Sequence, residues 1–596
     1  MPKEIINWDL SDFYQSINDP LIEKDIQELE KSAGIFYQNV KGNINNPLLT
    51  SKQLLEWALE YERISEILFY LHIYALLLYS INTLDDDVKS FYAKIDEFKV
   101  KVQEKLLFFK LELNMISDKK FEEFTKAPEL VRYSHFLKFN RLKKPHQLSE
   151  KEEQIILMKD ITGVSGFIKL YNELKSSFMF DFEIEGEKKR LTEAELFAFM
   201  YHQDKDLRYK ALQTMMAEYR KNEMIFTHIF NNVLKDWDLE SKKKNFIKSL
   251  YRRNLENEIS DESVEILVNV TTESYNVVEK YYNLKKKLLN LPELHMSDLY
   301  APVGQLAKKY SYQEALKLIK DAGEIFYPEF KDIIENMVKL NHIDATPRKG
   351  KNRGAFCEFG KLKHYPFVFV NFTNTIDSVR ALAHELGHAF HAFYIQRDQS
   401  FINLDISLVI AEIASVFNEI LIFDSLLNTE LLKEEKISLL CNFIESKFAT
   451  SYRQNAFYRF EKKLHNLLEK KLPTTEEIKT TFVKEMELMF GNSMSNINND
   501  YANFCFVVSH FLHTPFYVYA YNMSNLLVIS IYQLYLEEKE KFVPKYLKLL
   551  SIGSSLSPEE MLSEIGINLN DPSFWRKGIK YLSDKIEELE KMVSSN

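Results

Sequence analysis

The residues best suited to chemistry are His384, Glu385 and His388, which form the pattern His-Glu-x-x-His. They lie in the segment TIDSVRALAHELGHAFHAF, whose apolar positions recur at helical spacing. On a helix, residues four apart lie one above the other, so both imidazoles can face one ion. Glu385 projects from nearly the same face and can reach a water on that ion without ligating it. The pattern therefore predicts a zinc site with a glutamate beside it.

A catalytic zinc typically has three protein ligands and a water, so this segment leaves one ligand to be found. His391 lies on the same face but two turns from His384, and one helix cannot easily converge all three rings on one ion. The three-histidine motif His-Glu-x-x-His-x-x-Gly-x-x-His is excluded, because it requires Gly at 391 and His at 394. The chain has His391 and Tyr394 at those positions.

The third ligand is expected to be a carboxylate in the following segment, LDISLVIAEIASVFNEILIF. Glu412 stands among apolar and small residues, where an ionised carboxylate is costly unless it is paired or binds a metal. Asp405 is also a candidate, although it is equally explained as a helix cap. Glu419 lies on the face of Glu412 and fits an acceptor that orients a ligand imidazole, with a salt bridge as the alternative. We predict one Zn²⁺ per chain, held by His384, His388 and Glu412.

A second group of polar side chains occupies the apolar segment FCFVVSHFLHTPFYVYAYNMSNLL. At 100° per residue, His510, Tyr517 and Tyr521 fall within about 40° of one another, while Tyr519 points to the opposite face. Phenol and imidazole groups can donate to the oxyanion that forms when water attacks a peptide carbonyl. Packing in a core helix is the alternative explanation, and Pro515 makes the calculation of the helical face approximate.

The elements that must position these groups are predicted to be mainly helices. Only 15 Gly and 15 Pro occur in 596 residues, and this scarcity favours long helices with short connections. The aromatic and β-branched run Tyr365–Phe372 predicts a small β-sheet element over Gly354–Thr373. A short strand is expected at 178–185. Helical spacing is found over 19–39, 52–82, 84–113, 377–394, 406–427, 434–468, 475–490 and 504–537.

Composition excludes several classes of function. The net charge is −10 and no Lys/Arg stripe occurs, so nucleic acid is not an expected partner. The first twenty residues lack the apolar core of a secretory signal. The longest apolar run, Ile67–Ile81, is short for a membrane span and is better explained as a buried helix. Three widely spaced cysteines imply no disulfide framework. We expect a cytoplasmic protein without a membrane partner, and the oligomeric state is not indicated.

The chemistry-bearing segments together resemble a known family. The run GAFCEFGKLKHYPFVFVNFTNTIDSVRALAHELGHAFH, followed by AEIASVFNE and SHFLHTPFYVYAYNMSNLL, is similar to the oligoendopeptidase F branch of the thimet-oligopeptidase-like zinc metallopeptidases. Weaker similarity at SLYRRNLENEIS, DLYAPVG and SYRQNAFYRFE extends the resemblance over most of 190–580. The family implies a mostly helical fold split by a deep channel, with the zinc site on its floor. It also implies short unstructured peptides as substrates.

The resemblance further implies roles for single residues. The positions that match the family's zinc ligands and its general base are His384, His388, Glu412 and Glu385. The positions that match the segment contacting the substrate and the transition state are His510, Tyr517 and Tyr521. The stretch Phe367–Phe372 matches a strand that pairs with the substrate backbone. Substrate contacts are accordingly expected from Phe369, Asn371 and Gly354.

Two regions are expected along the chain, namely a helical region over 1–190 that forms one wall of the channel and a zinc metallopeptidase catalytic domain over 191–596. The expected activity is hydrolysis of internal bonds in oligopeptides by a zinc-activated water, with Glu385 as the general base. One alternative is a related helical metallocarboxypeptidase. It would need a fixed cationic residue for the substrate's terminal carboxylate, and no motif indicates one. The other is a non-catalytic peptide-binding protein, which would not need Glu385.

Overall fold

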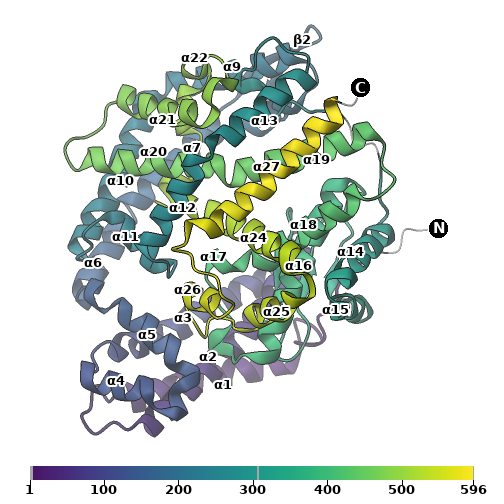
Figure 1. The fold of residues 1–596 in the computed structure, drawn as a ribbon. Helices are drawn as coiled ribbons and strands as arrows, with labels where there is room; N and C mark the ends of the chain where they lie inside the picture. The colour runs from purple at the N-terminus through teal and green to yellow at the C-terminus, as the bar shows by residue number, and fades with distance from the viewer. Residues whose placement is uncertain (1–4, 305–307, 595–596) are drawn as a thin grey trace. The chain divides into compact units, whose positions relative to one another are not determined.

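The computed structural model describes residues 5–304 and 308–594, and it is built mainly of α-helices (Figure 1). Among the described residues, the strands form only two small sheets. The mainly helical class with a small β-sheet element is thereby confirmed. The deep channel implied by the resemblance stays a prediction.

The chain forms two compact units, each assembled from segments that are far apart in the sequence. Unit 1 comprises Met1–Lys144, Lys308–Leu426 and Tyr535–Ile567. Unit 2 comprises Pro145–Ala307, Leu427–Leu534 and Asn568–Asn596. The two regions expected from the sequence, 1–190 and 191–596, divide the chain differently, and that division stays a prediction. The zinc motif belongs to unit 1, and the His510–Tyr521 segment belongs to unit 2.

Unit 1 contains a group of N-terminal helices that pack against one another and a second group that carries the zinc motif. Its helices are α1 (Pro20–Val40), α2 (Ser51–Ile81), α3 (Asp86–Leu113), α4 (Asp118–Lys126), α5 (Ser134–Leu142), α14 (Tyr312–Phe326), α15 (Pro328–Lys339), α16 (Ile376–Asp398), α17 (Leu408–Ala411), α18 (Ile413–Leu427), α25 (Val543–Ser551) and α26 (Pro558–Ser563).

Helix α2 is the longest helix of unit 1. By length and composition, it is the one helix within the described ranges that qualifies as a membrane span. Its apolar side chains nevertheless pack in the core of unit 1, where Leu54, Leu71 and Tyr74 are at most 2% exposed. This packing supports the interpretation of α2 as a core helix.

The sheet of unit 1 has three short strands in the order β3–β5–β4. The parallel pair is β3 (Ile343–Asp344) with β5 (Phe367–Phe369), and β4 (Phe356–Glu358) pairs antiparallel with β5. The aromatic run predicted as a strand is therefore the centre of the sheet. Trp8 packs on β5, with ring centroids 6.2 Å from Phe367 and 5.6 Å from Phe369. Both β4 and β5 lie against α16.

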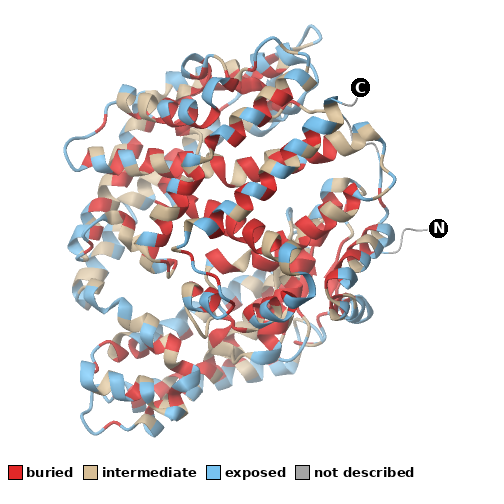
Figure 2. Ribbon diagram, in the orientation of Figure 1, coloured by how far each residue is buried: buried red, intermediate tan, exposed pale blue. Residues whose placement is uncertain are grey.

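Unit 2 is helical apart from one antiparallel hairpin, β1 (Phe180–Ile184) and β2 (Glu187–Leu191), which matches the strand expected at 178–185. Most of its helices carry both buried and exposed residues (Figure 2). They are α6 (Glu150–Asp160), α7 (Val164–Ser177), α8 (Glu193–Ala198), α9 (Lys205–Lys221), α10 (Glu223–Lys243), α11 (Ser249–Glu256), α12 (Asp261–Glu273), α13 (Tyr275–Leu288), α19 (Lys433–Thr450), α20 (Tyr452–Leu468), α21 (Thr475–Phe490), α22 (Ile497–Tyr501), α23 (His510–His513), α24 (Val518–Glu538) and α27 (Pro572–Ser594).

Three of the predicted helices are interrupted in the structure. The helix expected at 406–427 breaks at Glu412, and that at 434–468 breaks at Ser451. The helix expected at 504–537 was wrong as a single element. Pro515 disfavours a helical conformation of the residue before it, and Phe516 then has φ 59°. The segment consequently divides into a 3₁₀ turn, α23 and α24.

Candidate active site

Helix α16 brings the two histidines of the motif to one face. It begins after Thr375, whose side chain accepts a hydrogen bond from the Ser378 N–H as part of a capping box. His384 and His388 follow one turn apart, with 3.1 Å between their Nε2 atoms. Their rings are nearly perpendicular, at 84°. Two ring nitrogens thus point at one region of space.

Gly387, between the two histidines, lets the next long helix approach closely. A Cβ atom at this position would lie 2.5 Å from the carbonyl oxygen of Ala414 and 2.6 Å from Cα of Ser415. Both neighbours are backbone atoms, so a larger residue would force the two helices apart. Asn418 of α18 also donates a side-chain hydrogen bond to the Ala383 carbonyl. Helices α16 and α18 are therefore in direct contact at the level of the motif.

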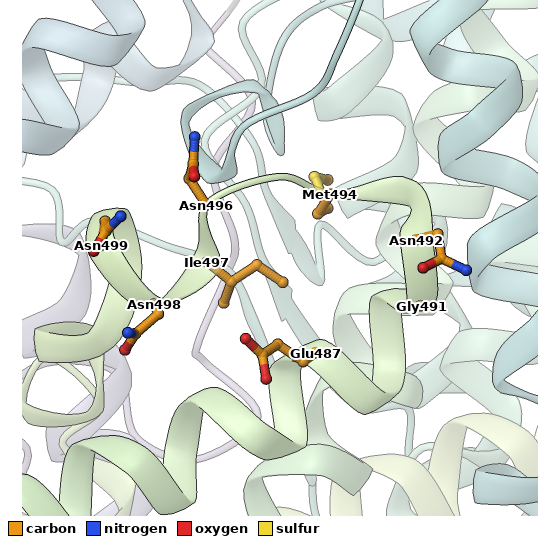
Figure 3. A pocket seen from close by; sticks show the side chains of 8 residues that line it. All are labelled: Glu487, Gly491, Asn492, Met494, Asn496, Ile497, Asn498 and Asn499. Atoms are coloured by element: carbon orange, nitrogen blue, oxygen red, sulfur yellow. The ribbon is translucent and has the colours of Figure 1, made fainter.

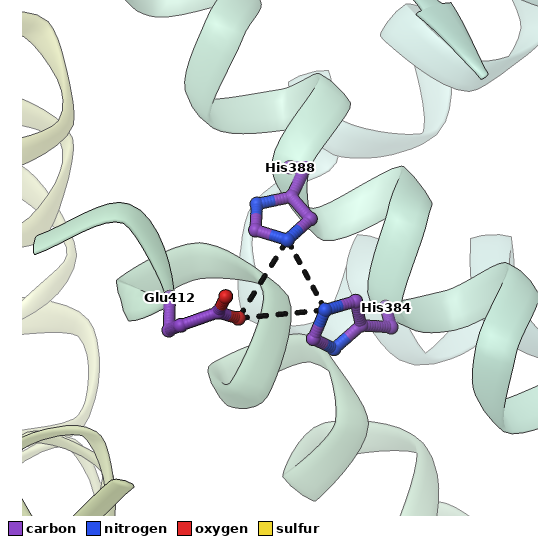
Figure 4. A group of neighbouring side chains, drawn as sticks. All are labelled: His384, His388 and Glu412. Atoms are coloured by element: carbon purple, nitrogen blue, oxygen red, sulfur yellow. Dashed lines mark hydrogen bonds and ion pairs between the residues drawn. The ribbon is translucent and has the colours of Figure 1, made fainter. Parts of the chain in front are cut away.

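Glu412 faces the two imidazoles from the break between α17 and α18. It ends α17 with φ −85° and ψ 0°. Its Oε2 atom lies 3.4 Å from His384 Nε2 and 3.6 Å from His388 Nε2 (Figure 4). Ser415 donates from Oγ to the same carboxylate oxygen at 2.7 Å and fixes its direction. Three possible ligand atoms from three residues thus form a small triangle.

The dimensions of this triangle fit a tetrahedral zinc ion. Ligands about 2.0–2.1 Å from zinc are about 3.3 Å apart at the tetrahedral angle. The sides of the triangle are 3.1, 3.4 and 3.6 Å. Two imidazoles and one carboxylate, with a fourth position left for water, are also the donor set of a catalytic zinc site rather than a structural one.

Glu419 contacts His384 at Nδ1, the ring nitrogen that does not face Glu412. His384 donates from Nδ1 to Oε1 of Glu419 at 2.6 Å, which leaves the lone pair on Nε2, the atom that faces Glu412. Burial favours a low pKa for His384, but the hydrogen bond and charge of Glu419 and the charge of Glu412 raise that pKa overall. Glu419 thus lies where an acceptor that orients a ligand imidazole has to lie.

Glu385 is buried beside the triangle without being part of it. It is 6% exposed, and its Oε2 makes no hydrogen bond within the described chain. Burial raises the pKa of Glu385 to about 7; the charge of His384 opposes this effect, and the charge of Glu412 adds to it. A carboxyl group with such a pKa can both take up and release a proton near neutral pH.

Two other candidates of the sequence analysis lie outside the triangle. His391 is buried, its ring nitrogens make no hydrogen bond to described residues, and burial lowers its pKa to about 3. Asp405 is exposed in the connection before α17. The group that can hold a metal ion, within the described ranges, contains Glu412 and neither of these residues.

Strand β5 lies between β3 and β4, which are the edge strands of the sheet. Within 367–369, β5 is paired on both sides and offers no free edge, whereas β4 is paired on one side. Pairing of the run Phe367–Phe372 with a substrate backbone stays a prediction. Phe369 is fully buried and stacks on Phe356 at 4.7 Å, so it is a core residue. Asn371 donates to the carbonyls of Asn352 and Gly354 at 2.9 and 3.0 Å and shapes the approach to β4.

Cys357, at the middle of β4, is a residue of the site that the sequence analysis did not single out. Burial raises the pKa of its thiol, and the charges of Glu385 and Glu358 add to that effect. The interaction with Glu385 places the edge strand beside the buried carboxylate. In a strand over Phe356–Glu358, side chains alternate between the two faces. This alternation would have predicted that Cys357 faces the side opposite to Phe356 and Glu358.

The second predicted group gathers in unit 2, although not on one continuous helix. The Tyr521 hydroxyl lies 3.1 Å from His510 Nε2, and the rings of Tyr517 and Tyr521 are 5.0 Å apart and perpendicular. The rings of His510 and Tyr517 are nearly parallel, 6.4 Å apart. Tyr519 points elsewhere, and its hydroxyl accepts a hydrogen bond from Asn257 at 2.8 Å.

A pocket at the connection between α21 and α22 contains none of the predicted residues (Figure 3). Its lining includes four asparagines but no histidine or cysteine, so it lacks the imidazole and thiolate ligands typical of a zinc site. The lining residues are Glu487, Gly491, Asn492, Met494, Asn496, Ile497, Asn498 and Asn499.

Comparison with known proteins finds relatives along nearly the whole chain. A family model described as Peptidase family M3 matches residues 198–581, and one described as Oligopeptidase F matches residues 112–180. The group B oligopeptidase PepB of Streptococcus agalactiae serotype III (strain NEM316) is 25% identical over 99% of this chain and 98% of its own length. The oligopeptidase PepF of Bacillus subtilis (strain 168) is 26% identical over 81% of this chain and 72% of its own length.

Solved structures share the fold. The crystal structure of oligoendopeptidase-F from Enterococcus faecium is similar with a TM-score of 0.70 at 21% identity, covering 96% of this chain and 99% of that chain. A crystal structure from Chlamydophila abortus is similar with a TM-score of 0.87 at 24% identity, covering 98% of both chains.

Proposed function

We propose that this chain, which belongs to peptidase family M3, is a zinc-dependent endopeptidase that hydrolyses internal bonds of short, unstructured peptides. The observation that carries the proposal is the triangle of His384, His388 and Glu412, whose sides match the ligand spacing of tetrahedral zinc. The relatives named as oligopeptidases support the substrate class. The resemblance predicted from the sequence is confirmed by the family match.

The proposed chemistry assigns a proton transfer to Glu385. A zinc ion bound by the triangle would lower the pKa of the attacking water and polarise the scissile carbonyl. Glu385 would take the proton from that water and deliver it to the leaving amine, because its carboxyl group is buried next to the ligand triangle without being one of the ligands. Glu419 keeps His384 in the tautomer whose Nε2 is free to bind the ion.

The substrate is proposed to be held by its backbone and by the His/Tyr group. The free edge of β4 can accept the backbone of an extended peptide as an added strand. His510, Tyr517 and Tyr521 are assigned the donation of hydrogen bonds to the oxyanion, on the strength of the family resemblance and of their mutual contacts.

We also propose one Zn²⁺ per chain and a cytoplasmic location. The triangle is the one group of three potential ligands found in the part of the chain that the structure describes. Cys357, Cys441 and Cys505 are free thiols, which suits a reducing compartment.

An internally quenched peptide blocked at both ends separates the endopeptidase from the related metallocarboxypeptidase. We expect cleavage at an internal bond of the blocked peptide, because an added-strand binding mode recognises backbone and needs no free terminus. Mass spectrometry of the products identifies the bond. Cleavage of the unblocked peptide alone, one residue at a time from its C-terminus, would favour the carboxypeptidase. Binding of the peptide without cleavage would favour the non-catalytic protein.

A further inference from the structure

The segment His510–Tyr521, here called the donor segment, contains a turn at 514–517, which a backbone hydrogen bond from the Tyr517 N–H to the Thr514 carbonyl closes at 3.1 Å. The Pro515 carbonyl and the Phe516 N–H, in the middle of this turn, bond side chains from other helices instead. We propose that Arg253 and Glu461 are positioning residues that clamp the turn inside this segment and thereby fix the tyrosines that follow it. The inference rests on the proposed function, since it concerns the residues that orient the proposed oxyanion donors.

The clamp consists of two side chains that bond the backbone of consecutive residues in unit 2. Arg253 of α11 donates from Nε to the carbonyl of Pro515 at 3.0 Å. Glu461 of α20 accepts from the N–H of Phe516 at 2.7 Å. Buried backbone groups require partners, and where no helix supplies them a side chain has to. Both partners here come from helices that are remote from Pro515 in the sequence.

The conformation at the turn is one that needs such support. Phe516 has φ 59°, a region that bulky residues rarely adopt. Its side chain is 1% exposed and packs on the ring of His465 at 4.4 Å. A conformation of this kind persists only where the surroundings enforce it. Without the acceptor of Glu461, the Phe516 N–H would be buried without a partner. The backbone would then have to shift to give this N–H another partner, and that shift would move Tyr517, the next residue.

Side chains of α7 also hold the backbone just before the donor segment, at Val507. Tyr171 and Lys175 donate to the carbonyl of Val507 at 3.1 and 2.9 Å. His513 Nε2 lies 3.0 Å from Oδ1 of Asn172. With this end fixed, the turn is the place where the direction of the tyrosines is set.

The clamp also explains two family-like segments of the sequence that do not contribute to the zinc site. Arg253 belongs to SLYRRNLENEIS and Glu461 to SYRQNAFYRFE, two of the segments with weaker resemblance. Neither segment contributes to the metal triangle. Their shared contact is the turn at Pro515 and Phe516.

A conservative and a disruptive variant of Glu461 distinguish positioning from simple support of the fold. Burial raises the pKa of Glu461 to about 8, so a neutral acceptor suits the site and Glu461→Gln should preserve the bond. Glu461→Met has a similar size but no acceptor. We expect Glu461→Met to speed hydrogen exchange of the peptide 510–521 by about tenfold or more. It should lower kcat by about 10- to 100-fold at unchanged zinc content, with a much smaller change in KM. Glu461→Gln should restore both.

Glu485→Gln is the matched control, because Glu485 is another buried carboxylate of unit 2 and pairs with Arg459 and Lys463 of α20. It should lower the melting temperature without changing exchange of the peptide 510–521 or kcat per folded molecule. Arg253→Met, which removes the contact to Pro515, gives a second test of the clamp and replaces Glu461→Met if that variant does not fold.

Tyr521→Phe separates failure of this inference from failure of the proposed function. If Tyr521→Phe lowers kcat while Glu461→Met and Arg253→Met change neither exchange nor kcat, the clamp is wrong and the proposed function stands. If Glu461→Met lowers only the melting temperature, as Glu485→Gln does, its role is support of the fold and the inference is overturned. If Tyr521→Phe leaves kcat unchanged, the donor role itself is wrong, and the positioning role falls with it.

Discussion

Replacement of Glu385 by Gln is expected to lower kcat by about 10²- to 10⁴-fold, the usual contribution of a general base. The amide keeps the size of the side chain but cannot take a proton from water. Bound zinc should remain at the wild-type level, because Glu385 lies outside the ligand triangle. Turnover of a quenched peptide and metal analysis of the same sample measure the two effects.

The matched control for this variant is Glu62→Gln. Glu62 is also a buried carboxylate of unit 1, 7% exposed against 6% for Glu385, and it accepts hydrogen bonds from Tyr133 and from the backbone of Ile402. Its replacement should leave kcat unchanged. Full activity of Glu385→Gln would remove the glutamate from the mechanism, and loss of zinc in that variant would mean that Glu385 is itself a ligand.

Removal of the third ligand by Glu412→Ala is expected to weaken zinc binding by more than about 100-fold, beyond the 10- to 100-fold effect of a residue that only supports a ligand. The alanine leaves two imidazoles on one helix and removes the carboxylate to which Ser415 donates, although the backbone carbonyl of residue 412 remains as an acceptor. Competition with a chromophoric chelator measures the affinity, and activity should fall in parallel with metal content.

Two further variants make the ligand assignment specific. Glu419→Gln should reduce zinc affinity by about 10- to 100-fold, because it weakens the orientation of His384 without removing a ligand. Asp405→Ala should change nothing, since Asp405 is exposed and outside the triangle. A Glu412→Ala protein with full zinc occupancy would place the third ligand elsewhere.

The parts of the site that the sequence predicts well are those fixed within one helix. His384 and His388 are four residues apart, so the period of the helix alone sets their common face. Glu412 is identified by the cost of an ionised group in an apolar segment, which is also a local property. The helix at 475–490 has the same bounds in the structure for a similar reason, since Thr474 and Glu477 form its capping box.

The parts that the sequence does not predict depend on contacts between distant residues. The break at Glu412 accompanies the approach of α18 to Gly387, which no local pattern reveals. The central position of β5 depends on β3, a strand of two residues that is too short to give a signal. The grouping of His510 with Tyr521 was predicted from a continuous helix that does not exist. It is achieved instead by a turn at Phe516 that Glu461 holds from another helix.

Titration of the metal-free protein with zinc, using the doubly blocked peptide as substrate, measures whether one bound zinc ion per chain is responsible for peptide hydrolysis. We expect no cleavage without metal, a linear rise of activity with added zinc, and saturation at one ion per chain, with products cut at an internal bond. Glu385→Gln should bind the same single ion and remain inactive in the same titration. Full cleavage by the metal-free protein, or an activity that zinc does not restore, would contradict this expectation.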